Sequence, residues 1–227
     1  MKIGVFGTGM VGRSIAGKLV DLGHEVMIGT RDVNNLFART EPDGMGNPPF
    51  SVWQTDYSQV QVGTYEATAA HGAIVFNCTS GSGALPALEQ AGAANLNGKV
   101  VIDISNPLDF SQGMPPSLFV SNTDSLGEQL QRAFPDVKIV KTLNTVNANL
   151  MVDPGLVNDG DHSIFVSGDD ADAKAQVADI LSSWFGWQDV IDLGDITTAR
   201  GTEMVLPIWV RLWGALQTPM FNLKVVR

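Results

Sequence analysis

The feature that most constrains this chain is a glycine-rich turn that directly follows its first apolar run. Residues 2–6 read KIGVF, an apolar stretch typical of a β-strand, and residues 7–12 read GTGMVG. After the turn, Ile15, Leu19 and Leu22 recur at helical spacing, which predicts an amphipathic helix. Glycines at this spacing permit the tight turn, bring the backbone close to a diphosphate and let the helix pack on the sheet. We therefore expect a dinucleotide to bind at Gly7, Thr8, Gly9, Met10, Val11 and Gly12.

Further apolar runs alternate with helical patterns along the chain. Runs such as AIVF and VVIDI are typical of strands buried on both faces of a parallel sheet. The alternation predicts an α/β protein with a doubly wound, mostly parallel sheet of the Rossmann type. We expect its strands near residues 2–6, 25–29, 60–64, 73–78, 99–104 and 138–143.

The pattern changes after residue 145. A strand is predicted in HSIFVSG, a helix over 171–186, a strand in DVIDLG and a long helix over about 197–216. We therefore expect a nucleotide-binding domain over 1–145 and a small C-terminal α/β lobe over 146–227. The Pro- and Gly-rich stretch EPDGMGNPPF, residues 41–50, predicts a surface loop.

The end of the second predicted strand indicates which dinucleotide is bound. Sites for NAD place Asp or Glu there, to accept a hydrogen bond from the ribose 2′-hydroxyl. This chain has Gly29, Thr30 and Arg31 instead, and a guanidinium suits the oxygens of a phosphate. We therefore predict NADP(H), with Thr30 and Arg31 at its 2′-phosphate. The adjacent Asp32 is expected to point away or to cap the next helix.

Two later strand ends carry small polar residues that can line the same site. Thr79 and Ser80 follow the fourth strand, and Asn106 follows the fifth. Ligands of open α/β sheets lie beyond the carboxyl ends of the strands, where these residues can approach the ribose and the nicotinamide. Ordinary turn chemistry is the alternative for each.

Composition excludes several classes of protein. The net charge of −10 argues against nucleic-acid binding, which needs a basic surface. The single cysteine, Cys78, rules out a disulfide within the chain and is typical of a reducing cytosol. The most apolar late stretch, MVLPIWVRLWGAL, is too short to span a membrane and contains Arg211. We expect a cytoplasmic protein without a membrane or nucleic-acid partner.

Motifs for acid–base or metal chemistry are missing from the sequence. His24, His71 and His162 lack the spacing of metal ligands, so we predict no metal site. There is no G-x-S-x-G elbow, and neither Tyr57 nor Tyr65 has a lysine four residues later. We assign no catalytic residue, which leaves orientation of two reactants as the protein's task. A flavin or deazaflavin acceptor suits this, because its ring nitrogen can take a proton from water.

Beyond these motifs, the chain resembles the family of NADPH-dependent oxidoreductases of the deazaflavin coenzyme F420. The resemblance is carried by GTGMVG, by GHEVMIGTRD, by IVKTLNTVNANLM and by ARGTEMVLPIWVRLWGALQTPMFNLKVV, and it covers nearly the whole chain. It implies that Thr79 and Ala148 lie along the nucleotide. It further implies that the deazaflavin is bordered by Asn144, Val146, Leu206 and Pro207, and that the protein forms a homodimer. One departure is Asn144, where archaeal members carry a histidine.

Two other readings stay open. The segment KTLNTV is also similar to the reductase domain of membrane metalloreductases, which implies an NADPH-dependent reductase of flavin or of another small acceptor. A non-catalytic redox sensor that binds NADP(H) is the third reading. The candidate cations for an anionic acceptor such as F420 are Lys141, Arg200 and Arg211.

Overall fold

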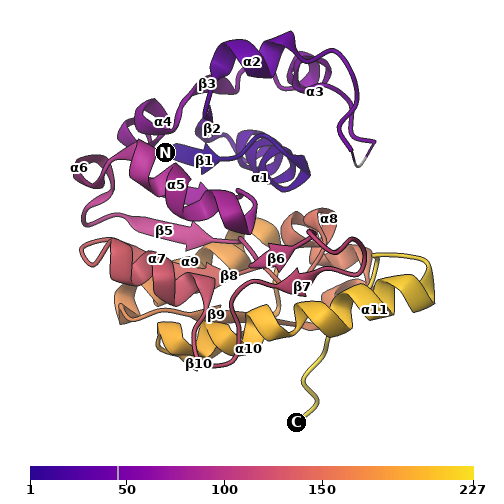
Figure 1. Cartoon of the computed structure of the whole chain (residues 1–227). Helices are drawn as coiled ribbons and strands as arrows, with labels where there is room; N and C mark the ends of the chain where they lie inside the picture. Colours follow the sequence, from indigo (N-terminus) through magenta and orange to yellow (C-terminus); the bar gives the residue numbers. More distant parts are fainter. Residues whose placement is uncertain (45) are drawn as a thin grey trace.

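The computed structural model describes residues 1–44 and 46–227, and it is built on one eight-stranded sheet (Figure 1). All neighbouring strands run parallel except β8 and β9, which pair antiparallel. The strand order is β10-β9-β8-β5-β4-β1-β2-β3. The strands are β1 (Lys2–Phe6), β2 (Glu25–Thr30), β3 (Gln61–Thr64), β4 (Ile74–Asn77), β5 (Val100–Asp103), β8 (Lys138–Thr142), β9 (Ser163–Ser167) and β10 (Asp189–Gly194).

The predicted fold class is confirmed. The chain builds outward from β1 through β2 to β3, then returns to the other side of β1 at β4 and continues to β5 and β8. Such a reversal opens a crevice between β1 and β4 at the carboxyl ends of the strands, and ligands of doubly wound sheets bind there. Strands β9 and β10 extend the same sheet across the predicted boundary at residue 145. The division into two domains stays a prediction.

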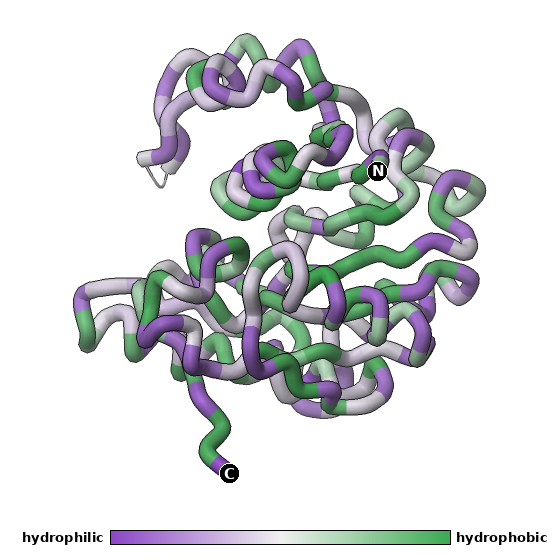
Figure 2. The backbone as a smooth tube through the Cα atoms, turned by 180° about the vertical axis from the view of Figure 1, so that it is seen from behind, coloured by the Kyte–Doolittle hydropathy of each residue, from purple (hydrophilic) through white to green (hydrophobic). Residues whose placement is uncertain are grey.

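Helices cover both faces of the sheet because the strand residues alternate between two apolar clusters. Ile74 and Phe76 pack in one cluster, while Val75 packs in the other. The central strands are accordingly largely hydrophobic (Figure 2). One face carries α1 (Met10–Asp21), α8 (Ala148–Val152), α9 (Ala171–Asp179) and the π-helix η3 (Ile180–Phe185). The other face carries α4 (Tyr65–His71), α5 (Gly81–Ala91), α6 (Ala93–Leu96) and α7 (Leu126–Ala133).

Several local predictions need correction. The helix predicted over 197–216 is two helices, α10 (Ala199–Met204) and α11 (Leu206–Leu216), because Pro207 has no N–H to continue the first. The helix predicted over 171–186 is α9 followed by the π-helix η3. Leu22 lies at the end of α1 and is 42% exposed, so it does not belong to the buried face.

Short elements that the sequence analysis did not predict complete the fold. Helices α2 (Val33–Ala38) and α3 (Phe50–Asp56) flank the predicted surface loop, whose described residues are mostly exposed; Met45 of that loop lies outside the described residues. A small hairpin, β6 (Leu108–Asp109) and β7 (Ser117–Leu118), follows β5 and lies beside α11 in Figure 1. Short 3-10 turns are η1 (Pro154–Leu156), η2 (Asn158–Gly160) and η4 (Ile196–Thr198).

Gly12→Ala is expected to destabilise the protein by about 1–3 kcal/mol, because overpacking forces the backbone apart. A Cβ at Gly12 would lie 1.9 Å from the carbonyl oxygen of Gly7, where α1 meets the end of β1. Urea unfolding measures the loss. Gly201→Ala is the matched control, because a Cβ there meets nothing within 4 Å, and we expect it to be neutral or stabilising by up to about 1 kcal/mol. Equal effects of the two variants would contradict the packing argument.

Candidate active site

The glycine-rich turn has the geometry that a diphosphate site needs. Gly7 leaves β1 with φ +100° and donates its N–H to the Gly29 carbonyl at 3.0 Å. A Cβ at Gly9 would meet nothing within 4 Å, so the backbone is open to solvent at this point. Helix α1 begins after Gly9 without a side-chain cap, which leaves the N–H groups of its first turn as donors for a ligand. The turn therefore fits the diphosphate of a dinucleotide.

The end of β2 presents an available cation beside this turn. Arg31 is exposed, and no hydrogen bond or ion pair engages it within 1–44 and 46–227. Burial raises the pKa of the Tyr65 hydroxyl, and the nearby Arg31 charge opposes that shift. Asp32 caps α2 by accepting the N–H of Asn35 at 2.9 Å, as expected from the sequence. The Asp32 carboxylate is thereby engaged within its own helix. Thr30, which directly precedes Arg31 in the chain, is half-buried.

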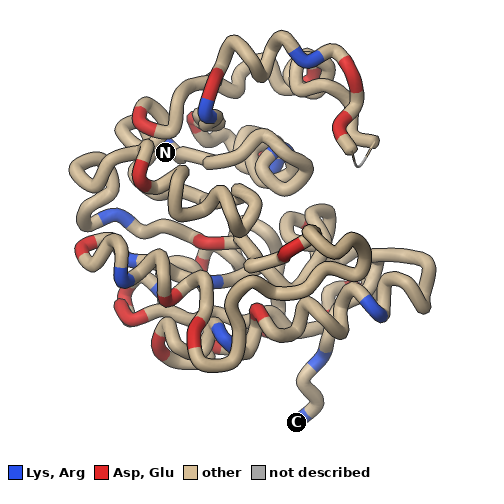
Figure 3. The backbone as a smooth tube through the Cα atoms, in the orientation of Figure 1, with Lys and Arg blue, Asp and Glu red and all other residues tan. Residues whose placement is uncertain are grey.

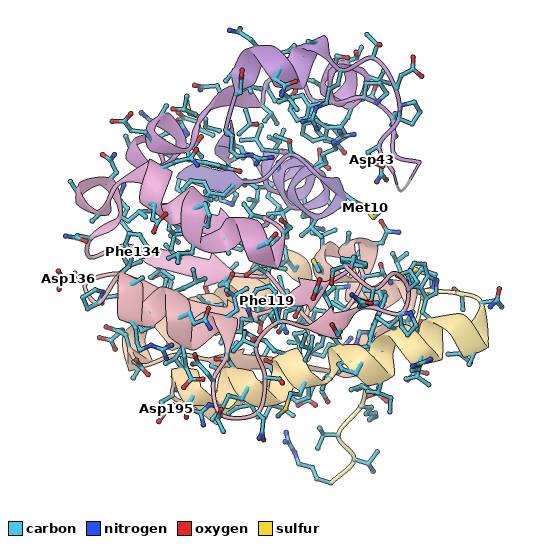
Figure 4. All side chains as sticks on the ribbon, in the orientation of Figure 1. Met10, Asp43, Phe119, Phe134, Asp136 and Asp195 are labelled. Carbon is cyan, nitrogen blue, oxygen red and sulfur yellow. The ribbon has the colours of Figure 1, made fainter. Side chains whose placement is uncertain are left out.

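A cavity of about 500 Å³ lies between the glycine turn and residues 38–43 and 48–50, which form its roof. Arg13 of α1 holds the two sides together. Its Nε donates to the Thr8 carbonyl at 2.8 Å and its Nη1 to the Pro48 carbonyl at 2.6 Å, while the guanidinium lies 5.5 Å from the Phe50 ring centre. Figure 4 shows Asp43 of the roof facing the start of α1, where Met10 lies. Arg13 could not be singled out from the sequence, because its role depends on contacts with residues as distant as Pro48.

The loops after β1, β4, β5 and β8 meet along one edge of the sheet. A Cβ at Gly7 would lie 2.7 Å from the Cys78 carbonyl oxygen and 3.2 Å from the Thr79 nitrogen. A Cβ at Gly81, which follows Ser80, would lie 2.0 Å from the Asn106 carbonyl oxygen. Asn106 in turn exchanges two hydrogen bonds with Asn144, at 2.8 and 2.9 Å. The predicted residues Thr79, Ser80, Asn106 and Asn144 thus form a continuous rim.

The remaining predicted residues lie further along this rim and on the last helix. Val146 and Ala148 are buried, and Ala148 begins α8, which packs against α1. Between Asn144 and Val146, the buried hydroxyl of Thr145 has no hydrogen-bond partner among the described residues. Leu206 is buried and Pro207 exposed in the first turn of α11. Both follow Glu203 of α10, whose carboxylate lies 2.9 Å from the Lys141 ammonium.

A buried ionic network lies directly behind the rim. Lys141 of β8 is 1% exposed and donates to Asp103 at 2.8 Å, to Glu203 at 2.9 Å and to the Ser105 carbonyl at 2.5 Å. Asp103 also accepts from the side chains of Asn77, at 2.8 Å, and of Ser105, at 2.7 Å. Burial alone would lower the pKa of Lys141, but the two carboxylates leave it raised. Lys141 is therefore a fixed cation that joins strands β8 and β5 and the loop after β5 to helix α10.

Two of the three cations considered for an anionic acceptor are already occupied, which corrects that expectation. Lys141 is enclosed by the network, and Arg200 forms a bidentate pair with Glu128 at 2.8 and 2.5 Å. Arg211 is exposed on α11. Figure 3 shows the Lys and Arg residues scattered over the chain among more numerous acidic ones.

Nucleophilic and metal chemistry find little support at this site. Burial and the neighbouring Asp103 raise the pKa of the Cys78 thiol, which disfavours the reactive thiolate. No group of three or more His, Cys, Asp or Glu side chains that could hold a metal ion occurs among the residues described.

No helix in the described part of the chain is long and apolar enough to cross a membrane.

Lys141→Met is expected to destabilise the protein by about 3–5 kcal/mol, because it leaves Asp103 and Glu203 as buried, uncompensated charges. The free energy of unfolding in urea measures the effect. Arg132→Ala, which breaks the exposed pair between Arg132 and Asp124, is the control and should cost less than about 1 kcal/mol. A loss for Lys141→Met as small as that of the control would show that the network is not needed for stability.

Comparison with known proteins identifies the family. The family model described as NADP oxidoreductase, coenzyme F420-dependent, matches residues 2–107. A solved structure from Arthrobacter sp. FB24, provisionally named an F420-dependent NADP reductase, is 60% identical, covers all of both chains and has a TM-score of 0.96.

Two curated relatives are more distant. The F420-dependent NADP reductase of Methanothermobacter marburgensis is 26% identical over 93% of this chain and 92% of its own length. Metalloreductase STEAP3 of Rattus norvegicus is 28% identical over 92% of this chain, which spans 38% of the length of that protein. Together with the glycine turn and the fold, these matches show that the chain belongs to the family of coenzyme F420-dependent NADP oxidoreductases and is an NADPH-dependent oxidoreductase.

Proposed function

We propose that this protein transfers a hydride, reversibly, between NADP(H) and the deazaflavin coenzyme F420. The observation that carries the proposal is the combination of an available Arg31 at the end of β2 with a rim that holds no free acid–base group among the described residues. The first feature suits the 2′-phosphate of NADP(H), and the second suits an acceptor that needs orientation only. The names of the Arthrobacter and Methanothermobacter relatives support the same acceptor.

The proposed nucleotide site follows the carboxyl edge of the sheet. The turn from Gly7 to Gly12, including Thr8, Gly9, Met10 and Val11, holds the diphosphate, and Thr30 with Arg31 holds the 2′-phosphate. The adenosine half then enters the cavity under the roof, beside Arg13. The nicotinamide half follows the rim, along Thr79, Ser80, Asn106 and Ala148.

The proposed acceptor site lies against the nicotinamide half. Bound NADPH supplies the hydride from C4 of its nicotinamide. Asn144, Val146, Leu206 and Pro207 then border the acceptor ring and set its distance and angle, while the apolar residues among them exclude water. The pairing of Asn144 with Asn106 fixes the side of the site nearest the nucleotide.

Homodimer formation, a cytoplasmic location and the two-domain division stay predictions. An NADPH-dependent reductase of flavin or of another small acceptor is the second candidate function, and the likeness to metalloreductase STEAP3 over 92% of this chain favours an acceptor other than F420.

Arg31→Ala should raise the apparent KM for NADPH about ten- to a hundredfold, because a charged hydrogen bond to phosphate is lost. The KM for NADH, which lacks that phosphate, should stay nearly unchanged. Steady-state kinetics with both nucleotides measures the split, and Arg132→Ala serves as the control for removal of an exposed guanidinium. An equal rise for both nucleotides would contradict the assignment of Arg31 to the 2′-phosphate.

An acceptor assay tests the reaction itself. The protein is mixed with NADPH and F420, and then with NADPH and FMN, while the absorbance of each acceptor is followed. We expect F420 to be bleached at enzymatic rates. Bleaching of FMN alone would establish the second candidate function, and nucleotide binding without turnover of either acceptor would point to the sensor.

A further inference from the structure

The side chain of Asn77 connects the buried ionic network to the proposed nucleotide site. Asn77 is fully buried at the end of β4, between Asp103 of β5 and Thr79 of the rim. Its amide nitrogen donates to Asp103 at 2.8 Å. Its amide oxygen accepts the hydroxyl of Thr79 at 2.8 Å and the N–H of Thr79 at 3.4 Å.

The direction of this chain of hydrogen bonds is fixed by Lys141. The ammonium only donates, so the Asp103 carboxylate that it contacts is held as an acceptor. Asn77 must therefore turn its NH₂ group toward Asp103 and its carbonyl toward Thr79. A hydroxyl has one proton to donate and two lone pairs, and the single proton of Thr79 is used by Asn77. Thr79 is left with lone pairs only.

We propose that Lys141, Asp103 and Asn77 are positioning residues that set Thr79 as a hydrogen-bond acceptor, which selects a donor group on the nicotinamide-ribose half of NADP(H). The inference rests on the proposed function. A phosphate oxygen cannot be the partner of Thr79, because it offers no proton. The adenosine half is excluded by place, since Arg31 follows β2 and Thr79 follows β4, on opposite sides of β1. The donor is a ribose hydroxyl or the carboxamide NH₂.

Thr79→Val tests the acceptor directly, with binding measured by calorimetry. Valine keeps the shape but has no lone pairs, so NADP⁺ and NADPH should bind about three- to tenfold more weakly. Thr79→Ser should restore most of that loss. 2′,5′-ADP, which lacks the nicotinamide half, should bind the Thr79→Val variant and the unsubstituted protein with the same affinity. The acetylpyridine analogue of NADP⁺ identifies the donor: an unchanged loss assigns the ribose hydroxyl, and a vanished loss assigns the carboxamide.

Asn77→Asp tests the relay through a pH profile. The carboxyl group that this variant introduces can, when protonated, donate to Asp103 and accept from Thr79, as the amide does. When ionised, it would face Asp103 with the same charge. The groups around position 77 are Asp103 of β5, Lys141 of β8 and, behind it, Glu203 of α10. Cys78 follows in the chain, and β1 presents Phe6, which does not titrate. The NADP⁺ affinity of the variant, divided by that of the unsubstituted protein, should therefore decrease as the pH rises from about 6 to about 9.

Three results would overturn the proposal. These are an unchanged NADP⁺ affinity in Thr79→Val, an equal loss of 2′,5′-ADP affinity in that variant, and a flat affinity ratio in Asn77→Asp. A failure of the proposed function is distinguishable from all three, because it shows as equal binding of NADPH and NADH and as loss of the Arg31 effect. The 2′,5′-ADP arm also reports whether each variant is folded.

Discussion

The ion pairs of one buried lysine hold together the carboxyl edge of the sheet, where the rim lies. Lys141 contacts Asp103, Glu203 and the carbonyl of Ser105, so strands β5 and β8, the loop after β5 and helix α10 are tied to a single ammonium group. Glu203 extends the tie to α7 by accepting the N–H groups of Leu126 and Gly127, at 2.8 and 3.0 Å. Replacing Lys141 with a neutral residue would leave the Asp103 and Glu203 carboxylates buried without a counter-charge, which is among the costliest changes in a protein interior.

The same network borders the rim. Hydrogen bonds through Asp103 and Asn77 reach Thr79, and Ser105 directly precedes Asn106, the partner of Asn144, in the chain. Side chains held in this way lose little freedom when a ligand binds, and orientation of two ring systems is the chemistry that the site can provide. Acid–base groups are not needed for that task, which agrees with the modest set of polar side chains at the edge.

Much of this architecture could be predicted from the residues. Apolar runs of strand length predicted the strands of the main sheet, and the spacing of Gly7, Gly9 and Gly12 located the turn into α1. Asp32 was expected to cap the next helix, and it does. These features are local, so they are written in neighbouring residues. The hairpin β6–β7 was not predicted, because strands of two residues carry no periodic signal.

The ionic network could not be predicted in the same way. Lys141 looked like a free cation, because its partner Asp103 is 38 positions away in the sequence and Glu203 is further still. One signal was present: Asp103 interrupts the otherwise apolar run VVIDI, and a carboxylate buried in a sheet needs a partner. Arg13 was missed for a similar reason, since its contact at Pro48 is set by the path of the chain and not by spacing along a helix.

The bond from Arg13 to the roof ends on a backbone carbonyl, and this has a consequence for how the protein can change. Every amino acid supplies the same carbonyl, so this one hydrogen bond does not depend on the side chain at position 48, whereas the packing of the guanidinium against Phe50 does depend on that ring. The hydrogen bond does depend on where the chain passes. A substitution at position 48 would thus leave an acceptor in place, whereas an insertion or deletion in the chain before Pro48 would move the carbonyl away from the guanidinium and loosen this side of the cavity.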